Sequence, residues 1–151
     1  MSMLRDSDYL DAAIAEAKKA EAFGEVPVGA VLVDDNGDVL AKAYNQTIST
    51  HNATAHAEIE VLKKAGKTVG NYRLPNTTLY VTLEPCPMCA GAIVHARVGR
   101  VVFAAKDWRT GACGSVFSLH DSAALNHRFQ ADFIERQDYI HLLTSFFKKK
   151  R

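Results

Sequence analysis

The sequence predicts an α/β sandwich built around a mixed β-sheet. Five apolar segments have the length and composition of strands, and they cover residues 26–33, 39–44, 77–83, 98–105 and about 129–134. Segments with helical signals lie before the first strand, between the later strands and after the last one. Strands that alternate with helices are typical of α/β folds, in which helices cover the faces of the sheet.

Four helices are expected. The first should begin at Ser7 or Asp8, either of which can act as its N-cap, and should stop at Gly24. Apolar side chains recur on one face of it, at Leu10, Ile14 and Ala17. The second should run over about residues 56–66, where Gly66 gives a stop signal, and the third over about residues 87–96, with proline in its first turn. A terminal amphipathic helix is indicated by Tyr139, Leu142, Leu143, Phe146 and Phe147.

A hairpin should join the first two strands, because Asn36 and Gly37 form a turn dipeptide between two strand-like segments. The first of these strands is too uniformly apolar to have a solvent-exposed face. Its small residues Gly29 and Ala30 fit two interpretations equally: they let a flat base approach the backbone, or they let a helix pack closely. In the fourth strand, the run 101–103 predicts burial on both faces.

Two cysteines, Cys86 and Cys89, stand three residues apart where the third helix should begin. At this spacing their thiolates lie on one face of a helical turn and can converge on one cation. His56, at the start of the second helix, offers a third ligand. Three protein ligands leave a fourth tetrahedral position open for water, which distinguishes a catalytic zinc from a closed structural one. The pattern therefore predicts one catalytic zinc ion.

Glu58 follows the histidine by two positions. Such positions diverge by about 200° around a helix, so the two side chains are not expected to bind one ion together. Together these residues read His-x-Glu, then Pro-Cys-x-x-Cys, which is the signature of zinc-dependent nucleobase and nucleoside deaminases. We therefore expect the carboxylate to take a proton from zinc-bound water and to protonate the ring nitrogen and the departing amine.

Each of these residues also has a simpler interpretation. A Cys-x-x-Cys pair can be redox-active, a lone histidine is usually a core residue, and a helical glutamate usually faces solvent. A closed structural zinc site needs a fourth ligand. Because Cys113 is the only other cysteine, a Cys3His site is the sharpest alternative to the catalytic one.

The composition favours a single compact domain over residues 1–151, with 48% hydrophobic and 23% charged residues. The N-terminal residues lack the apolar core of a signal peptide, and no run is long enough to span a bilayer. Three cysteines, two of them expected to bind metal, do not suggest a secreted disulfide framework. We therefore expect a cytoplasmic protein without a membrane partner.

A net charge of +1 does not indicate a nucleic-acid-binding protein, so any RNA site must be local. The basic run 148–151 is either a solvated helix end or an RNA contact. Trp108 can stack on an exposed base or act as a packing anchor. Asn45 can turn the chain or pair with a base or ribose. His51 and His95 are expected at the surface.

Over nearly its whole length the chain resembles the bacterial tRNA-specific adenosine deaminases of the cytidine deaminase-like superfamily. Besides the zinc signature, the resemblance rests on the flanking segments 26–31, 71–74, 99–103, 110–112 and 126–127, among others. The zinc signature alone would indicate only the superfamily. The resemblance implies a three-layer α/β/α sandwich with a central mixed five-stranded sheet.

The resemblance also implies hydrolytic conversion of adenosine to inosine at the wobble position of a tRNA anticodon loop. Zinc-bound hydroxide would attack C6, with one zinc ion per subunit and Glu58 as the proton shuttle. The enzyme would be a homodimer whose subunits both shape each RNA site.

Four residues would contact the substrate by this resemblance. Asn45 would contact the target nucleoside, Val28 would line the pocket, and the Ala57 backbone would help to orient the base. Asp107 would lie near the backbone of the preceding nucleotide, where it can read the 2′-OH that distinguishes RNA from DNA. Trp108 and Cys113 depart from the family pattern, in which smaller residues are common at these positions.

Two other functions also fit these residues. A small-molecule deaminase acting on guanine or cytidine would use the same zinc chemistry, but segments 110–112 and 126–127 argue against it. A noncatalytic, zinc-stabilised RNA-binding module is the second alternative, and Glu58 argues against it because a structural site does not need that carboxylate. The terminal helix with its basic end resembles the family's RNA-flanking helix, which favours RNA contact for residues 148–151.

Overall fold

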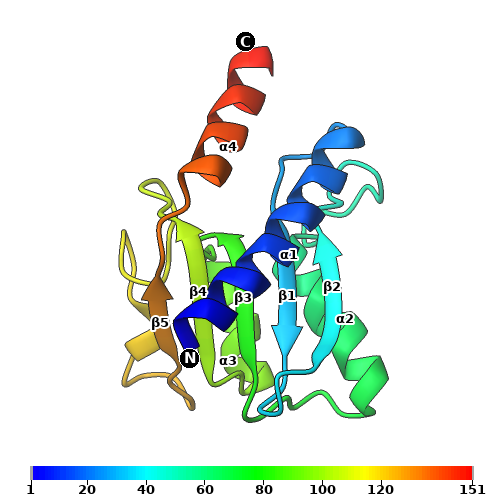
Figure 1. Cartoon of the computed structure of the whole chain (residues 1–151). Helices are drawn as coiled ribbons and strands as arrows, with labels where there is room; N and C mark the ends of the chain where they lie inside the picture. Colours follow the sequence, from blue (N-terminus) through cyan, green and yellow to red (C-terminus); the bar gives the residue numbers. More distant parts are fainter. Residues whose placement is uncertain (1, 151) are drawn as a thin grey trace.

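The centre of the molecule is a five-stranded β-sheet (Figure 1). The computed structural model describes residues 2–150, and side chains from residue 5 onward. The strands are β1 (Gly29–Val33), β2 (Val39–Tyr44), β3 (Thr78–Leu83), β4 (Arg100–Ala105) and β5 (Gln130–Phe133), in the spatial order β2-β1-β3-β4-β5. β1 is antiparallel to β2 and β3, whereas β4 is parallel to β3 and β5. The predicted mixed sheet is confirmed.

Helices cover both faces of this sheet. They are α1 (Ser2–Ala22), α2 (Ala57–Val69), α3 (Pro87–Ala96) and α4 (Gln137–Lys150), with a short 3₁₀ helix, η1, at Leu119–Asp121. Figure 1 shows α1 crossing one face, α2 and α3 on the other, and α4 rising beyond the end of the sheet. The predicted three-layer sandwich is therefore confirmed. Within residues 2–150, none of the helices has the length and apolar composition of a membrane-spanning segment.

Alternate side chains of the central strands pack into two separate cores. On β4, Val101 and Phe103 pack with apolar residues of α2 and α3, whereas Val102 and Ala104 pack with those of α1 and α4. All five residues of β1 are buried. Because helices cover both faces, these strands are uniformly apolar rather than alternating. The predicted burial of the run 101–103 on both faces is confirmed.

The first helix begins at Ser2, so the prediction of Ser7 or Asp8 as its N-cap is wrong. The capping signal is local, whereas the additional turn is held by tertiary hydrogen bonds that Asp6 accepts from Tyr80 on β3 and Arg100 on β4. Tertiary contacts of this kind outweigh capping preferences of about 1 kcal/mol. The predicted end is confirmed, because the helix stops at Ala22 and Gly24 has a φ of 78°.

The second helix continues past Gly66 and ends at Val69, so the predicted stop at Gly66 is wrong. Gly70, with a φ of 78°, forms the left-handed C-cap, and its N–H donates to the carbonyl of Gly66 at 2.8 Å. A glycine inside a helix costs only about 1 kcal/mol, which packing of the helix readily offsets. The third helix has the predicted bounds.

Gly29 allows α1 to pack closely on β1. A Cβ at this position would lie 2.0 Å from the carbonyl oxygen of Ala13 and 2.5 Å from the amide nitrogen of Ala17. Of the two interpretations of this glycine, close helix packing is therefore the one that the fold uses. The predicted hairpin between β1 and β2 is also confirmed, with Gly37 in its turn at a φ of 86°.

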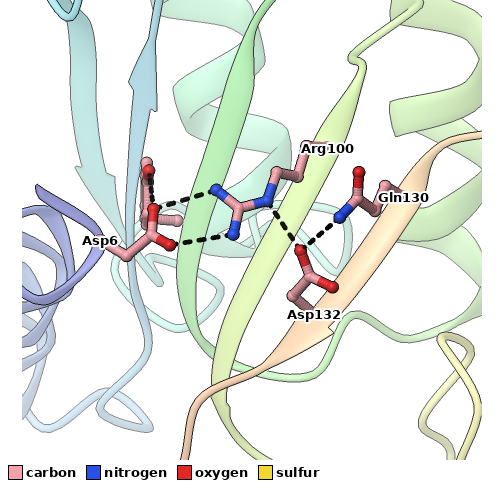
Figure 2. Close-up of polar contacts among 5 residues, drawn as sticks. Asp6, Arg100, Gln130 and Asp132 are labelled. Carbon is pink, nitrogen blue, oxygen red and sulfur yellow. Dashed lines mark hydrogen bonds and ion pairs between the residues drawn. The ribbon is translucent and has the colours of Figure 1, made fainter. Parts of the chain in front are cut away.

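Arg100 ties α1 to the parallel half of the sheet (Figure 2). Its Nη1 and Nη2 donate to the two carboxylate oxygens of Asp6, both at 2.9 Å, and its Nε donates to Asp132 on β5 at 2.8 Å. Tyr80 on β3 also donates its hydroxyl proton to Asp6, and Gln130 donates to Asp132. Asp6 is buried, so its charge depends on these partners.

Candidate zinc centre and substrate cleft

Three metal-binding side chains meet where α2 and α3 begin. His56 is the N-cap residue of α2, Cys86 is the N-cap residue of α3, and Cys89 lies in the first turn of α3. Nδ1 of His56 lies 3.6 Å from Sγ of Cys86 and 3.5 Å from Sγ of Cys89. These three donor atoms form a group within 4.8 Å of one another. The structure thus brings together the three ligands that the sequence predicted.

The geometry of these donors fits zinc. Tetrahedral bonds of about 2.3 Å to sulfur and about 2.0 Å to nitrogen would place the nitrogen and sulfur ligands about 3.5 Å apart. The two observed nitrogen–sulfur distances, 3.5 and 3.6 Å, agree with this value. Two sulfurs and one imidazole nitrogen are also a donor set that zinc favours. Residues His56, Cys86 and Cys89 can therefore hold one zinc ion.

The two cysteine thiols differ in how readily they lose a proton, which each must do to bind a cation. A hydrogen bond from Cys89 lowers the pKa of the Cys86 thiol to about 4, and His56 contributes in the same direction against the effect of burial. The same interaction with Cys86, together with burial, raises the pKa of Cys89. The pair thus favours one thiolate at neutral pH, and a cation bound to both sulfurs would displace the remaining proton.

Glu58 lies beside the metal-binding group but is not part of it. Its side chain is buried, with 4% of the residue exposed, yet it contributes to the wall of the cleft described below. Burial raises the pKa of Glu58 to about 7, and the nearby Cys86 thiolate adds to the rise. A carboxyl group in this range can accept a proton and return it near neutral pH.

Cys113 does not complete a closed metal site. Within the described part of the chain, the group of clustered donors contains only His56, Cys86 and Cys89. Cys113 is buried, and this burial, with the nearby negative charges of Glu84 and Glu58, raises the pKa of its thiol to about 12. The Cys113 thiol therefore stays protonated and lies outside the group of metal ligands. This argues against the closed Cys3His site.

A cleft of about 860 Å³ opens from the metal-binding group. His56, Glu58 and Cys86 line it, as do three of the predicted substrate-binding residues, Val28, Asn45 and Asp107. The fourth, Ala57, is fully buried as the first residue of α2, and its side chain does not reach the cleft. His51 and His95 are exposed, as predicted.

The lining of the cleft also includes aromatic and basic side chains. The loop after β4 contributes Trp108, which is 70% exposed, and Lys106, whose Nζ lies 5.4 Å from the centre of the indole ring. α4 contributes Phe147 and two lysines of the basic run, Lys148 and Lys150. The last residue of that run, Arg151, lies outside the described residues.

Two buried glutamates that the sequence analysis did not single out fix the loops around the cleft. The carboxylate of Glu25 accepts backbone hydrogen bonds from Ile48 at 3.1 Å and from Ser49 at 2.6 Å, which holds the loop that follows Asn45. Glu84 does the same for the loop that begins at Asp107. Glu25 stands beside a predicted strand and Glu84 beside a metal ligand, but neither position reveals its hydrogen-bond partners, which come from distant segments.

Comparison with known proteins identifies the family of this site. The model of the family described as "Cytidine and deoxycytidylate deaminase zinc-binding region" matches residues 3–105. The tRNA-specific adenosine deaminase of Haemophilus influenzae is 47% identical over 97% of this chain and 85% of its own length. The enzyme of the same name from Bacillus subtilis is 45% identical over 99% of this chain and 92% of its own.

Two solved structures have the same fold. A structure from work on A-to-I editing by tRNA:A34 deaminases at the wobble position of transfer RNA aligns with a TM-score of 0.81 and 41% identity, over 85% of this chain and 98% of that one. The guanine deaminase of Bacillus subtilis aligns with a TM-score of 0.64 and 29% identity, over 94% and 93% of the two chains. The chain therefore belongs to the tRNA-specific adenosine deaminases, within the cytidine and deoxycytidylate deaminase zinc-binding family.

Proposed function

We propose that this protein hydrolyses adenosine to inosine, with release of ammonia, at the wobble position of a tRNA anticodon loop. The observation that carries the proposal is the position of Glu58, a buried carboxyl group that lies beside three zinc-binding side chains and lines an open cleft. A structural zinc site has no use for such a carboxylate or for an opening to solvent. The tRNA substrate is inferred from the relatives, whose names specify tRNA.

Glu58 would carry the protons of the reaction. Zinc held by the three ligands supplies Lewis acidity that activates a water molecule near neutral pH. During hydrolysis at C6, Glu58 would accept a proton from the attacking water and pass it to the adjacent ring nitrogen. A second transfer through the same carboxyl group would carry the remaining proton of the attacking oxygen to the amino group at C6. The C–N bond then breaks and a C6 carbonyl forms, so that water is consumed and ammonia is released. Burial shields these transfers from bulk solvent.

The other cleft residues would bind and orient the nucleoside. Val28 offers an apolar contact to the base, and the Asn45 carboxamide can hydrogen-bond to the base or ribose. The backbone of Ala57, next to the histidine ligand, would help to orient the base. Asp107, which also lines the cleft, would read the 2′-OH of the preceding nucleotide.

The proposal extends to partners and cellular setting. Residues 1–151 would act as one deaminase domain that binds the anticodon stem-loop in the cytoplasm. Trp108, Phe147 and the lysines that line the cleft suit RNA, because bases stack on aromatic rings and phosphates attract cations. A homodimer would bury the exposed apolar side chains Val69 and Tyr72, which are 49% and 70% exposed at the end of α2.

The experiment that tests the function compares substrates. Zinc-loaded protein is incubated with an anticodon stem-loop that carries adenosine at the wobble position and, separately, with free guanine, cytidine and adenosine. Mass spectrometry then measures inosine in the digested RNA and the products of the free compounds. Conversion of the stem-loop alone is the expected result. A matched stem-loop with guanosine at the wobble position serves as the substrate control.

Two outcomes would contradict the proposal. Turnover of a free base or nucleoside without conversion of the RNA would move the protein to the small-molecule deaminases, a class to which its similarity to guanine deaminase also points. Tight binding of the stem-loop without turnover of any compound would make it a noncatalytic zinc-stabilised RNA-binding module.

A further inference from the structure

Glu84 connects the metal site to the wall of the cleft. It follows the last residue of β3 and precedes Pro85 and Cys86, and its backbone N–H donates to the carbonyl of Ala105 at 2.9 Å, which extends the pairing of β3 with β4. Only 2% of the residue is exposed. The backbone of Glu84 thus lies between the end of β3, which is held in the sheet, and the metal ligand Cys86 two residues later.

The carboxylate of Glu84 is satisfied by a single loop, residues 107–115. One oxygen accepts hydrogen bonds from the backbone N–H of Asp107 at 3.1 Å and from the hydroxyl of Ser115. The other accepts from the backbone N–H groups of Cys113 at 3.0 Å and of Ser115 at 3.1 Å. Among the described side chains, no cation forms an ion pair with it. The buried carboxylate of Glu84 is therefore stabilised by hydrogen bonds from this loop.

The loop is wrapped tightly around this carboxylate. A Cβ on Gly111 would lie 2.4 Å from the carbonyl oxygen of Asp107 and 2.5 Å from Cδ of Glu84. The N–H of Ala112 donates to the carbonyl of Pro85 at 2.8 Å, so the loop also contacts the backbone next to the metal ligand. These contacts leave the loop little freedom to move relative to the metal site.

The outer side of the same loop faces the cleft, through Asp107, Trp108, Arg109 and Thr110. The Asp107 side chain is oriented within the loop, because its carboxylate accepts a hydrogen bond from the N–H of Arg109 at 3.0 Å. Any substrate that reaches the metal site therefore passes a wall whose position depends on Glu84.

We propose that Glu84 is a positioning residue that holds the 107–115 loop at a fixed distance from the metal site and thereby sets the affinity for substrate. Glu84 also lines the cleft, but both of its carboxylate oxygens are occupied by hydrogen bonds from this loop, so it acts through the loop. The inference rests on the proposed RNA deaminase function for its kinetic readout.

The test uses Glu84→Gln, which preserves size but replaces an acceptor oxygen with an amide group that cannot accept the same hydrogen bonds. We expect KM for the anticodon stem-loop to rise tenfold or more, kcat to change by less than threefold, and the protein to keep one zinc ion per chain. Ser115→Ala removes one of the four hydrogen bonds and should raise KM by a smaller factor, of two or more. Ser115→Ala also tests the positioning role by itself if Glu84→Gln does not fold.

The control is Glu16→Gln, since Glu16 is a buried glutamate on α1 that lies outside the cleft and bonds to Lys19. It should leave KM unchanged. Three results would overturn the inference: an unchanged KM in both loop variants, a fall in kcat alone, which indicates a loss of folded protein, or a loss of zinc, which indicates a role at the metal.

Failure of the proposed function has a different signature. If the wild-type protein deaminates no RNA, equilibrium binding of the same stem-loop replaces KM, and the dissociation constant should rise tenfold or more in Glu84→Gln. An unchanged dissociation constant would then count against the positioning role by itself.

Discussion

His56 and Cys89 are 33 positions apart in the sequence, yet Nδ1 of the histidine lies 3.5 Å from Sγ of the cysteine. The two atoms meet because the N-terminal ends of α2 and α3 come together on one face of the sheet. Cys86 approaches the same nitrogen. A zinc ion bound here would therefore join two helices that no covalent bond links directly.

Removal of one metal ligand should release zinc. We expect Cys89→Ser to reduce bound zinc from about one ion per chain to well below half, and to lower the midpoint of thermal unfolding, because a ligand of the folded state stabilises it. Elemental analysis after dialysis and calorimetry measure the two effects. Cys113→Ser is the matched control, since this buried cysteine lies outside the donor group. A loss of zinc from Cys113→Ser would indicate a closed four-ligand site instead.

Substitution of Asp107 should change the choice of sugar more than the metal content. We expect Asp107→Asn to reduce the preference for a stem-loop with ribose, rather than 2′-deoxyribose, at the nucleotide before the target adenosine by about tenfold. A hydrogen bond to a charged acceptor contributes about 1.5–3 kcal/mol, which is enough for this change. The ratio of kcat/KM for the two stem-loops is the measurement. Equal loss on both, or loss of zinc, would contradict the assigned role.

The lysines of α4 should contribute to RNA binding through phosphates. We expect Lys148→Ala with Lys150→Ala to weaken tRNA binding and to reduce the slope of log K against log salt by about 1 to 2, because each phosphate contact contributes about 0.7 to 0.9. Lys18→Ala with Lys42→Ala is the control, since it removes the same charge from exposed positions outside the cleft. Equal slopes for the two double variants would show that the basic end is only a solvated helix terminus.

The Asp6–Arg100 pair should contribute to stability. Loss of Asp6 leaves Arg100 with only one carboxylate partner, so Asp6→Asn should lower the free energy of unfolding at pH 7 by about 3 kcal/mol. Asp11→Asn is the control, because Asp11 also pairs with an arginine, at 2.7 Å, but is 61% exposed. An exposed pair contributes less than about 1 kcal/mol. Urea unfolding measures both values, and equal effects would contradict the account.

The stability difference caused by Asp6→Asn should depend on pH. Burial alone would raise the pKa of Asp6, but hydrogen bonds from Arg100 and Tyr80 outweigh burial and hold the pKa below its ordinary value. A carboxyl group whose pKa is lower in the folded state stabilises the fold fully above its unfolded pKa of about 3.9 and loses that effect as pH falls. The difference between wild type and Asp6→Asn should therefore be constant from pH 7 to 5 and should shrink below about pH 4. Metal loss at low pH affects both proteins and cancels in the difference.

Much of the fold follows from local patterns in the sequence. The third helix was predicted with its observed bounds because Pro87 marks its first turn, and the central strands β1, β3 and β4 were found because both of their faces are buried. The helix bounds that were wrong, at Ser7 or Asp8 and at Gly66, are places where a local signal competes with tertiary contacts or with a stronger signal nearby. A single sequence does not rank such competing signals. The predicted start of the first strand at residue 26 was also wrong, because the N–H of Val28 donates to the carbonyl of Val26 and β1 begins only at Gly29.

The site could be predicted in part. The zinc ligands and Glu58 stand in short motifs whose spacing reflects the chemistry, so they were visible before the fold was known. The roles of Glu25 and Glu84 were not visible, because the hydrogen bonds of their carboxylates go to backbone groups 23 to 31 residues away. Every residue except proline has a backbone N–H group, so the sequence does not reveal which residues donate to these carboxylates.

The most direct test of the central claim is the single-turnover conversion of a wobble-adenosine stem-loop by zinc-loaded wild-type protein and by zinc-loaded Glu58→Gln, with inosine measured by mass spectrometry and zinc by elemental analysis. The account predicts that both proteins hold one zinc ion per chain and that the rate of inosine formation falls by at least about a hundredfold in the variant, as expected for loss of a general acid–base group. Inosine formation at a near-normal rate by Glu58→Gln, with zinc bound, would contradict it.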